Sequence, residues 1–204
     1  MALSLLRTDV LRRDRAALLD VAEALFYERG IRAVGMDAVR TATGQSLKRI
    51  YGMFSTKEEM VVAALRRHDR RWRASLTEYV EQHEDPRERV LAIFDWLERW
   101  FAQPDFRGCA WTNAYGELGS TSPAILAEVR GHKEAFHDQI AGWVQPCATL
   151  PADAVALLAE GAIVTAAITG DPTVARPARA AAHALIGGAR GDGDGENLGG
   201  ATGA

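Results

Sequence analysis

Apolar residues recur every three or four positions through most of the chain, which is typical of amphipathic helices. Gly, Pro and helix-capping residues divide this pattern into segments. The helices are expected at about residues 8–30, two short helices within 34–57, then 56–84, 86–103, 105–119, 122–145, 151–169 and 173–186. The pattern predicts an all-α fold.

The stretch from Val34 to Lys57 predicts two short helices joined by a tight turn. Apolar residues at helical spacing stop at Gly44, which can adopt a positive φ, and then resume. Such short helices need support from a third helix, because they are not stable alone. The preceding segment offers one apolar face with Leu18, Leu19, Ala22, Leu25 and Phe26. A three-helix head containing a helix-turn-helix is therefore expected, although a plain helical hairpin has the same spacing.

The side of the second short helix that faces away from its apolar residues is polar. It carries Gln45, Ser46, Lys48 and Arg49. Amide, hydroxyl and basic groups can donate to base edges and to phosphates. This surface is the candidate for reading DNA.

The charge is divided unevenly along the chain. Residues 1–72 contain 14 basic and 9 acidic side chains, whereas residues 73–204 contain 10 basic and 18 acidic ones. A basic head would attract DNA phosphates, and an acidic body would be repelled by them. The distribution favours a nucleic-acid partner bound at the head, with a merely solvated basic surface as the alternative.

Residues 18–60 resemble the head of the TetR/AcrR family of bacterial regulators. The resemblance rests on Ala22, Leu25-Phe26, Gly30, Val39, Gly44, Ser46, Ile50-Tyr51, Phe54, Lys57-Glu58 and Met60. Arg40, Thr43 and Gln45 depart from the usual Ala, Ala and Val of the family, which affects the operator sequence more than the fold. The resemblance implies a dimeric DNA-binding transcription regulator, in most cases a repressor controlled by a small molecule.

Helix face and family pattern together suggest roles for the head residues. Gln45, Ser46, Lys48 and Arg49 are expected to reach the major groove, and Tyr51 and Lys57 to hold phosphates. Lys57 follows Ser55 and Thr56, which can cap a new helix whose free N–H groups favour an anion.

The second part of the chain, residues 57–187, is expected to form a helical body that binds the effector and forms the dimer. Its large rings suggest a cavity for an apolar compound, although rings at helical spacing also serve as ordinary core. The candidate ligand-binding residues are Trp72, Trp96, Trp100, Trp111, Tyr115 and Glu117.

The last two expected helices carry many small apolar residues, which permit close approach of another helix. Two such helices from each subunit would make a four-helix bundle, as in the TetR/AcrR family. A charge at Ala159 or Ala162 is then expected to weaken the dimer. The alternative is that both helices complete the core of one subunit.

Two other classes of function remain open. An enzyme would use Cys109 as nucleophile with His132 or His137 as base, but no catalytic signature surrounds Cys109. An architectural DNA-binding protein would need no effector cavity. No metal site or cofactor is expected, because neither paired ligands nor a phosphate-binding glycine loop occurs.

The remaining expectations concern location and the end of the chain. A cytoplasmic protein without a membrane span or signal peptide is expected, with a head at residues 1–56 and Cys109 and Cys147 as free thiols. Residues 188–204 are rich in glycine and are expected to be a disordered tail.

Overall fold

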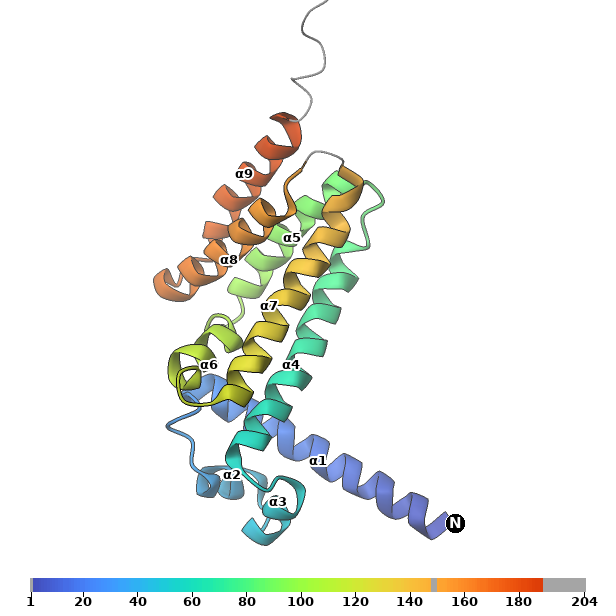
Figure 1. Cartoon of the computed structure of the whole chain (residues 1–204), viewed down its shortest axis with the longest axis vertical. Coiled ribbons are helices and arrows are strands. Elements are labelled where there is room, and N and C mark those ends of the chain that lie inside the picture. Colours follow the sequence, from blue (N-terminus) through green and yellow to red (C-terminus); the bar gives the residue numbers. More distant parts are fainter. Residues whose placement is uncertain (1, 148–149, 189–204) are drawn as a thin grey trace, which may run out of the picture.

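The structure is a computed structural model that describes residues 2–147 and 150–188, and within them it contains helices and no strand (Figure 1). The all-α prediction is confirmed. The expected tail lies outside the described residues from position 189 onward. The α-helices are α1 Ala2–Arg29, α2 Met36–Thr43, α3 Leu47–Met53, α4 Lys57–Val80, α5 Pro86–Phe101, α6 Ala110–Leu118, α7 Pro123–Val144, α8 Ala152–Thr169 and α9 Ala175–Gly188.

The helix-turn-helix forms as the spacing predicts. Gly44 ends α2 with φ of 66°, and the Ser46 side chain caps α3 by accepting from the Arg49 N–H. Ile50 and Phe54 turn into the head and are fully buried. The guanidinium of Arg15 covers the Phe54 ring at 4.4 Å. The head is therefore held together by the apolar face that the sequence indicates.

Helix α1 begins at Ala2, whereas the sequence suggests a start at Thr8 or Asp9. The upstream residues contain good helix formers and neither Gly nor Pro, so nothing interrupts the helix before Thr8. The capping preference of Thr and Asp is too weak to start a helix where helical residues already precede them. Figure 1 shows the N-terminal half of α1 extending away from α2 and α3.

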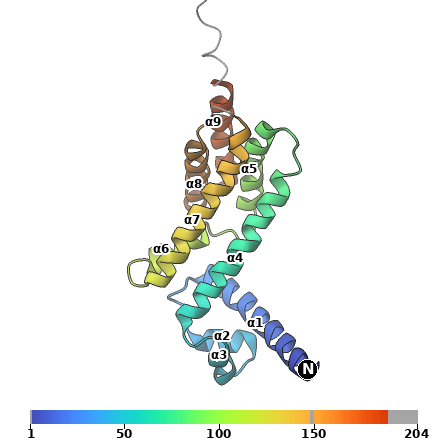
Figure 2. The same ribbon diagram turned by 45° about the vertical axis from the view of Figure 1, so that its right-hand side comes forward.

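Helix α4 leaves the head and becomes one of the long helices of the body (Figures 1 and 2). The Thr56 side chain caps it by accepting from the Glu59 N–H. Met60, Val61, Ala64 and Leu65 are buried at its head end, and Trp72, Leu76 and Val80 at its body end. One continuous helix thus contributes to both cores.

The body packs α4, α5 and α7 side by side, with α8 and α9 against α5 and α7 (Figures 1 and 2). Helix α6 lies against the first half of α7. It starts at Ala110, later than the expected residue 105, because Cys109 is its N-cap and Gly108 before it has φ of 83°. A residue with positive φ cannot belong to a right-handed helix.

The small apolar face of α8 packs inside its own subunit. Ala159 and Ala162 are buried, as are Val155, Ile163 and Ala166. The expectation that Ala159 and Ala162 form the subunit interface is therefore corrected. A different stripe of α8 is exposed, with Leu157 at 66%, Val164 at 41% and Ile168 at 79%.

Helix α8 is also long and apolar enough to cross a membrane, judged by length and composition alone. Its mean hydropathy is 1.6, and one third of it is buried. The sequence pattern did not single it out, because Asp153 and Glu160 interrupt its apolar residues.

Candidate DNA interface and effector site

Helix α3 presents most of the predicted DNA-reading residues to solvent. The side chains of Lys48, Arg49 and Tyr51 are exposed, whereas Ile50 is buried. Ser46 is also exposed, and its Oγ accepts from the Arg49 N–H. It keeps its own hydroxyl proton for a phosphate or base.

Two of the predicted reading residues have additional features. The Arg49 guanidinium forms an ion pair with Asp14 of α1. Gln45 precedes the cap of α3 and is half-buried, and its Oε1 is buried without a hydrogen-bond partner among the described residues. Both side chains would have to rearrange in part to contact a base edge.

Lys57 is directed into the protein, not toward solvent in front of α4. Its Nζ donates to the carbonyl of Ile31 in the loop after α1. Partial burial lowers the pKa of Lys57, and the nearby Glu117 carboxylate opposes that effect. In this arrangement the ammonium group fixes the α1–α2 corner, whereas the sequence suggests a phosphate contact.

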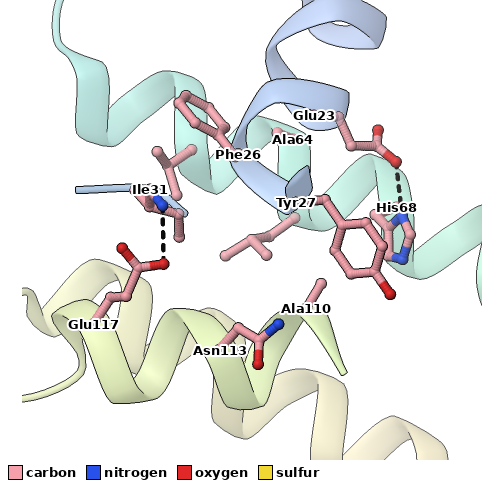
Figure 3. Close-up of a pocket in the computed structure, with 11 residues that line it drawn as sticks. Glu23, Phe26, Tyr27, Ile31, Ala64, His68, Ala110, Asn113 and Glu117 are labelled. Atoms are coloured by element: carbon pink, nitrogen blue, oxygen red, sulfur yellow. Dashed lines mark hydrogen bonds and ion pairs between the residues drawn. The ribbon is translucent and has the colours of Figure 1, made fainter. Parts of the chain in front are cut away.

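Glu117 joins α6 to the head. The sequence makes it a candidate ligand-binding residue and does not predict this contact. Its carboxylate accepts from the N–H of Ile31 at 2.9 Å, as Figure 3 shows, and from the N–H of Arg32 at 2.7 Å. The Arg32 side chain donates in return to the Glu117 carbonyl at 2.6 Å. The head is therefore held by α6 as well as by α4.

Tyr27 strengthens the same junction. Its hydroxyl donates to the Gly108 carbonyl at 2.8 Å and accepts from the Arg107 N–H at 2.8 Å. Burial raises the pKa of Tyr27 to about 12, despite the favourable hydrogen bond from Arg107. The hydroxyl thus stays protonated and keeps both bonds at any physiological pH.

A small cavity of about 40 Å³ lies between α1, α4 and α6, at this junction. Glu23 and His68 face each other on one side, with Nδ1 to Oε1 at 2.6 Å, and Asn113 and Glu117 lie on the other (Figure 3). A drug-sized ligand needs several hundred Å³. The cavity as it stands is too small for such an effector.

The aromatic residues of the body form a packed cluster around Trp72. Its ring meets Trp96, Trp100, Trp111 and Phe136 at centroid distances of 5.1 to 6.3 Å, all edge to face. The Trp72 Nε1 is buried without an acceptor among the described residues. Tyr115 is 57% exposed and forms no part of the cluster.

Trp96 and Trp100 also line an open groove of about 370 Å³ between α4 and α5. Tyr79 and Arg99 stand on its wall, with the guanidinium 4.7 Å from the Tyr79 ring centre. Trp111 is buried and stacks on His132 at 3.4 Å. Of the six candidate ligand residues, the structure brings Trp96 and Trp100 to one groove and Trp72 behind them.

Comparison with known proteins decides the family. The model of the family described as "Bacterial regulatory proteins, tetR family" matches residues 18–64. The HTH-type transcriptional activator FasR of Mycolicibacterium smegmatis is 30% identical over 165 residues, which cover 77% of this chain and 71% of FasR. The chain belongs to the TetR family.

Solved structures agree with this TetR-family fold. SCO4454, a TetR-family transcriptional regulator from Streptomyces coelicolor, is 25% identical with a TM-score of 0.76, over 86% of this chain and 95% of that one. A TetR regulator from Chloroflexus aurantiacus has the same fold, with a TM-score of 0.76 at 24% identity, over 88% of this chain and 96% of its own. This TetR-family chain is thus a DNA-binding transcription regulator, as these relatives are.

The TetR-family body contains one cluster that the sequence only partly indicates. Cys109 and His132 come together, and His132 Nδ1 meets Asp69 Oδ1 at 2.7 Å. His137, the other candidate base, lies 3.8 Å from Glu160 instead. Asp69 has no sequence signal, because it is 40 residues from Cys109 and looks like any exposed acid on α4.

Ion pairs that join α1 to α4 were also not evident from the sequence. Arg67 pairs with Asp20, Arg71 with Asp20 and Glu23, and His68 with Glu23. The partners lie 45 to 51 residues apart in the chain. The available signal was the charge pattern of each helix. Asp20 and Glu23 are three residues apart on α1, and Arg67 and Arg71 are four residues apart on α4, so each pair lies on one face of its helix.

Proposed function

We propose that this TetR-family regulator is a cytoplasmic homodimeric repressor that leaves its operator when a small apolar, ring-containing effector binds. The head comprises residues 1–56, and the effector and dimer surfaces belong to residues 57–187. The observation that carries the proposal is that α4 runs from the head into the aromatic cluster at Trp72. One continuous helix thus connects the DNA-binding head with the aromatic cluster beside the proposed effector groove.

The proposed DNA contacts are Gln45, Ser46, Lys48, Arg49 and Tyr51. The exposed Lys48 and Arg49 on α3 are suited to base edges and phosphates of the major groove. Lys57 donates a hydrogen bond to the Ile31 carbonyl, so it positions the helix-turn-helix and does not contact DNA itself. Arg49 must exchange Asp14 for DNA, which limits its net gain.

The proposed effector site is the groove between α4 and α5. Trp96 and Trp100 lie with their ring centres 5.7 Å apart and can stack a flat apolar group. Its volume of about 370 Å³ falls in the range of small-molecule sites. The other three candidate ligand residues lie elsewhere. Trp111 is part of the core, Tyr115 is on the surface, and Glu117 belongs to the contact between α6 and the head.

Effector binding in this groove would change DNA affinity through the position of α4. Trp72 touches both groove tryptophans and lies fifteen residues from Lys57, about 22 Å along the helix. If the effector binds a conformation with a tilted α4, the two heads of the dimer change separation and no longer fit successive major grooves. By linkage, operator DNA must weaken effector binding by the same factor.

The proposed dimer surface is the exposed stripe of α8 with α9. Leu157, Val164 and Ile168 share one side of α8, and Gly161 between them has open space around its Cα. Leu185 on α9 is also exposed. Burying these residues against a second copy removes a continuous apolar patch from water and would form a four-helix bundle.

Selection of bound DNA from a random pool tests the first half of the proposal. A near-palindromic site whose half-sites lie about one DNA turn apart, or a multiple of it, is expected. The selected site placed over a promoter then decides the sign of regulation. Lower reporter expression supports a repressor, and higher expression would show an activator, the term used for FasR.

Tryptophan fluorescence titrations with aromatic compounds, with and without the selected DNA, test effector control. The expected result is tryptophan quenching with weaker binding in the presence of DNA. Equal affinity in both titrations would contradict the coupling between the groove and the head. A Trp100→Ala variant should lose the effector but keep the DNA, because Trp100 lies outside the head.

A further inference from the structure

Cys109 lies where α6, α7 and α8 meet, and it is only 5% exposed. As the N-cap of α6, its Sγ accepts from the Thr112 N–H at 3.4 Å. The Lys133 Nζ of α7 lies 3.8 Å from the same sulfur and also binds Glu160 of α8. A helix N-terminus and an ammonium group both favour negative charge on the sulfur.

His132 completes the cluster from the next position on α7. Its imidazole lies close enough to the Cys109 thiol to lower the pKa of that thiol, while its Nδ1 meets Asp69 Oδ1 at 2.7 Å. Asp69 is held in turn by Arg73 through Nε and Nη2 at 2.8 to 3.0 Å. With Nδ1 donating to the carboxylate, Nε2 is the nitrogen that can take the thiol proton. Stacking on Trp111 fixes the ring at an interplanar angle of 6°.

This arrangement is that of an activated nucleophile with its base and an orienting carboxylate. Burial by itself raises the pKa of Cys109, but His132, the charge of Lys133 and the Thr112 N–H lower it to about 7. The other thiol, Cys147, has a pKa raised by burial. Cys109 therefore loses its proton more readily near neutral pH than an ordinary thiol does, whereas Cys147 loses its proton less readily.

We propose that Cys109 is a modification site, a buried thiolate that reduces hydrogen peroxide and becomes a sulfenic acid. A sulfur lone pair attacks one peroxide oxygen, an S–O bond forms and the O–O bond breaks. The departing hydroxide takes a proton from the Lys133 ammonium or the His132 imidazolium and leaves as water. The sulfur loses two electrons and the peroxide gains them.

Burial of the sulfur selects the class of reagent. Because Cys109 is only 5% exposed, a bulky electrophile cannot contact it unless the bundle opens, so its reagent must be a small molecule. Lys133 and His132 supply the proton that the departing oxygen needs. A small oxidant that needs a proton donor matches this site.

The product is expected to remain a sulfenic acid because no second thiol can reach it. Cys147 follows the end of α7, and eleven helical residues separate Lys133 from that end, about 16 Å. A disulfide requires Cα atoms less than about 7 Å apart. Cys147 therefore serves as an internal reference and not as a partner.

Oxidation of Cys109 would alter the contact between α6 and the head. The sulfur caps the first turn of this nine-residue helix, and Glu117 at its last turn holds the N–H groups of Ile31 and Arg32. A sulfenic oxygen placed among α6, α7 and α8 requires α6 to shift, which loosens that hold. This consequence for DNA affinity rests on the proposed function, whereas the chemistry at Cys109 does not.

The test exposes reduced wild-type protein to hydrogen peroxide between pH 5 and 9 and traps sulfenic acid with dimedone. Peptide mass spectrometry then follows Cys109 and Cys147 separately. At pH 7 Cys109 should react about fivefold faster or more, because its larger thiolate fraction outweighs the lower nucleophilicity of a low-pKa thiolate. Its rate should level off above pH 8, while that of Cys147 keeps rising.

Lys133 variants show whether charge at the sulfur is the cause. Lys133→Arg should keep the midpoint of the rate profile near pH 7, and Lys133→Met should move it upward and slow the reaction at pH 7. Lys133 is partly exposed, so both proteins should fold. A wild-type Cys109 that reacts no faster than Cys147, or that has the pH profile of a free thiol, would overturn the proposal.

Operator binding separates this chemistry from the proposed function. Peroxide should change the affinity of wild-type protein for the selected DNA but not that of Cys109→Ser, which keeps an oxygen acceptor at the α6 cap. Sulfenic acid at Cys109 with unchanged DNA affinity would refute transmission through α6. Failure of the reduced protein to bind any DNA would refute the proposed function and leave the peroxide measurement valid.

Discussion

Replacing Ile168 by Glu should split the proposed dimer into folded monomers. Ile168 is 79% exposed on the α8 stripe, so nearly its whole side chain remains available for burial by a second subunit. Full burial of an isoleucine stabilises by about 1.5 to 3 kcal/mol, and two-fold symmetry counts each substitution twice. The loss is about 2 to 5 kcal/mol, before any cost of burying the carboxylates.

Such a loss raises the dimer dissociation constant about thirtyfold or more, since about 1.4 kcal/mol corresponds to a factor of ten. Sedimentation velocity across nanomolar to micromolar concentrations measures it, and circular dichroism reports whether the helices persist. Ala124→Glu is the matched control, because it adds the same charge at an exposed position in the first turn of α7. It should leave the dimer intact.

Ala162→Glu distinguishes this surface from the face that packs inside the subunit. Ala162 is buried in its own subunit, so a carboxylate there should lower the thermal unfolding temperature before it affects association. An Ile168→Glu protein that sediments as a dimer at micromolar concentration, with unchanged unfolding, would refute the assignment of the α8 stripe.

Three further changes test the head, the junction and the Cys109 cluster. Arg49→Ala should relax base preference at one operator position and cost about 1 to 3 kcal/mol, measured by binding to single-base operator variants. Glu117→Gln should destabilise the head by about 1 to 2 kcal/mol in urea unfolding, because two backbone N–H groups lose a charged acceptor. Asp69 keeps a pKa of about 2 despite burial, through His132 and Arg73. Its stabilisation, at most about 2 kcal/mol, is complete above pH 4 and is lost as the pH falls toward 2, so Asp69→Asn should flatten acid unfolding in that window.

The helix-turn-helix could be predicted from sequence because its determinants are local. Gly44, the Ser46 cap and the buried Ile50 and Phe54 all lie within a dozen residues, where helical periodicity and capping rules apply. The division of the chain into helices is predictable for the same reason. The observed starts of α1 and α6 differ from the predicted ones. A residue that can cap a helix does not have to start one, so its position alone does not fix where the helix begins.

The roles of single polar residues in the candidate site depend on partners far away in the sequence. Lys57 meets Ile31, 26 residues away, and Glu117 meets Ile31, 86 residues away. No local pattern encodes such pairs. Helix α8 presents a related difficulty, because a helix that is apolar on most sides does not reveal which side faces its own subunit.

The head is connected to the body by two contacts of unequal strength, and this difference determines how it can move. Along α1 and α4 the connection buries a continuous apolar surface that includes Leu18, Phe26, Val61 and Leu65. At α6 it depends chiefly on the hydrogen bonds that Glu117 accepts from the head and on those of the Tyr27 hydroxyl, and three of these bonds are solvent-exposed. Burial of those apolar side chains is worth several kcal/mol, whereas each such hydrogen bond contributes about 1. A conformational change that starts in the body should therefore release the head from α6 first, while α1 and α4 move together as one unit.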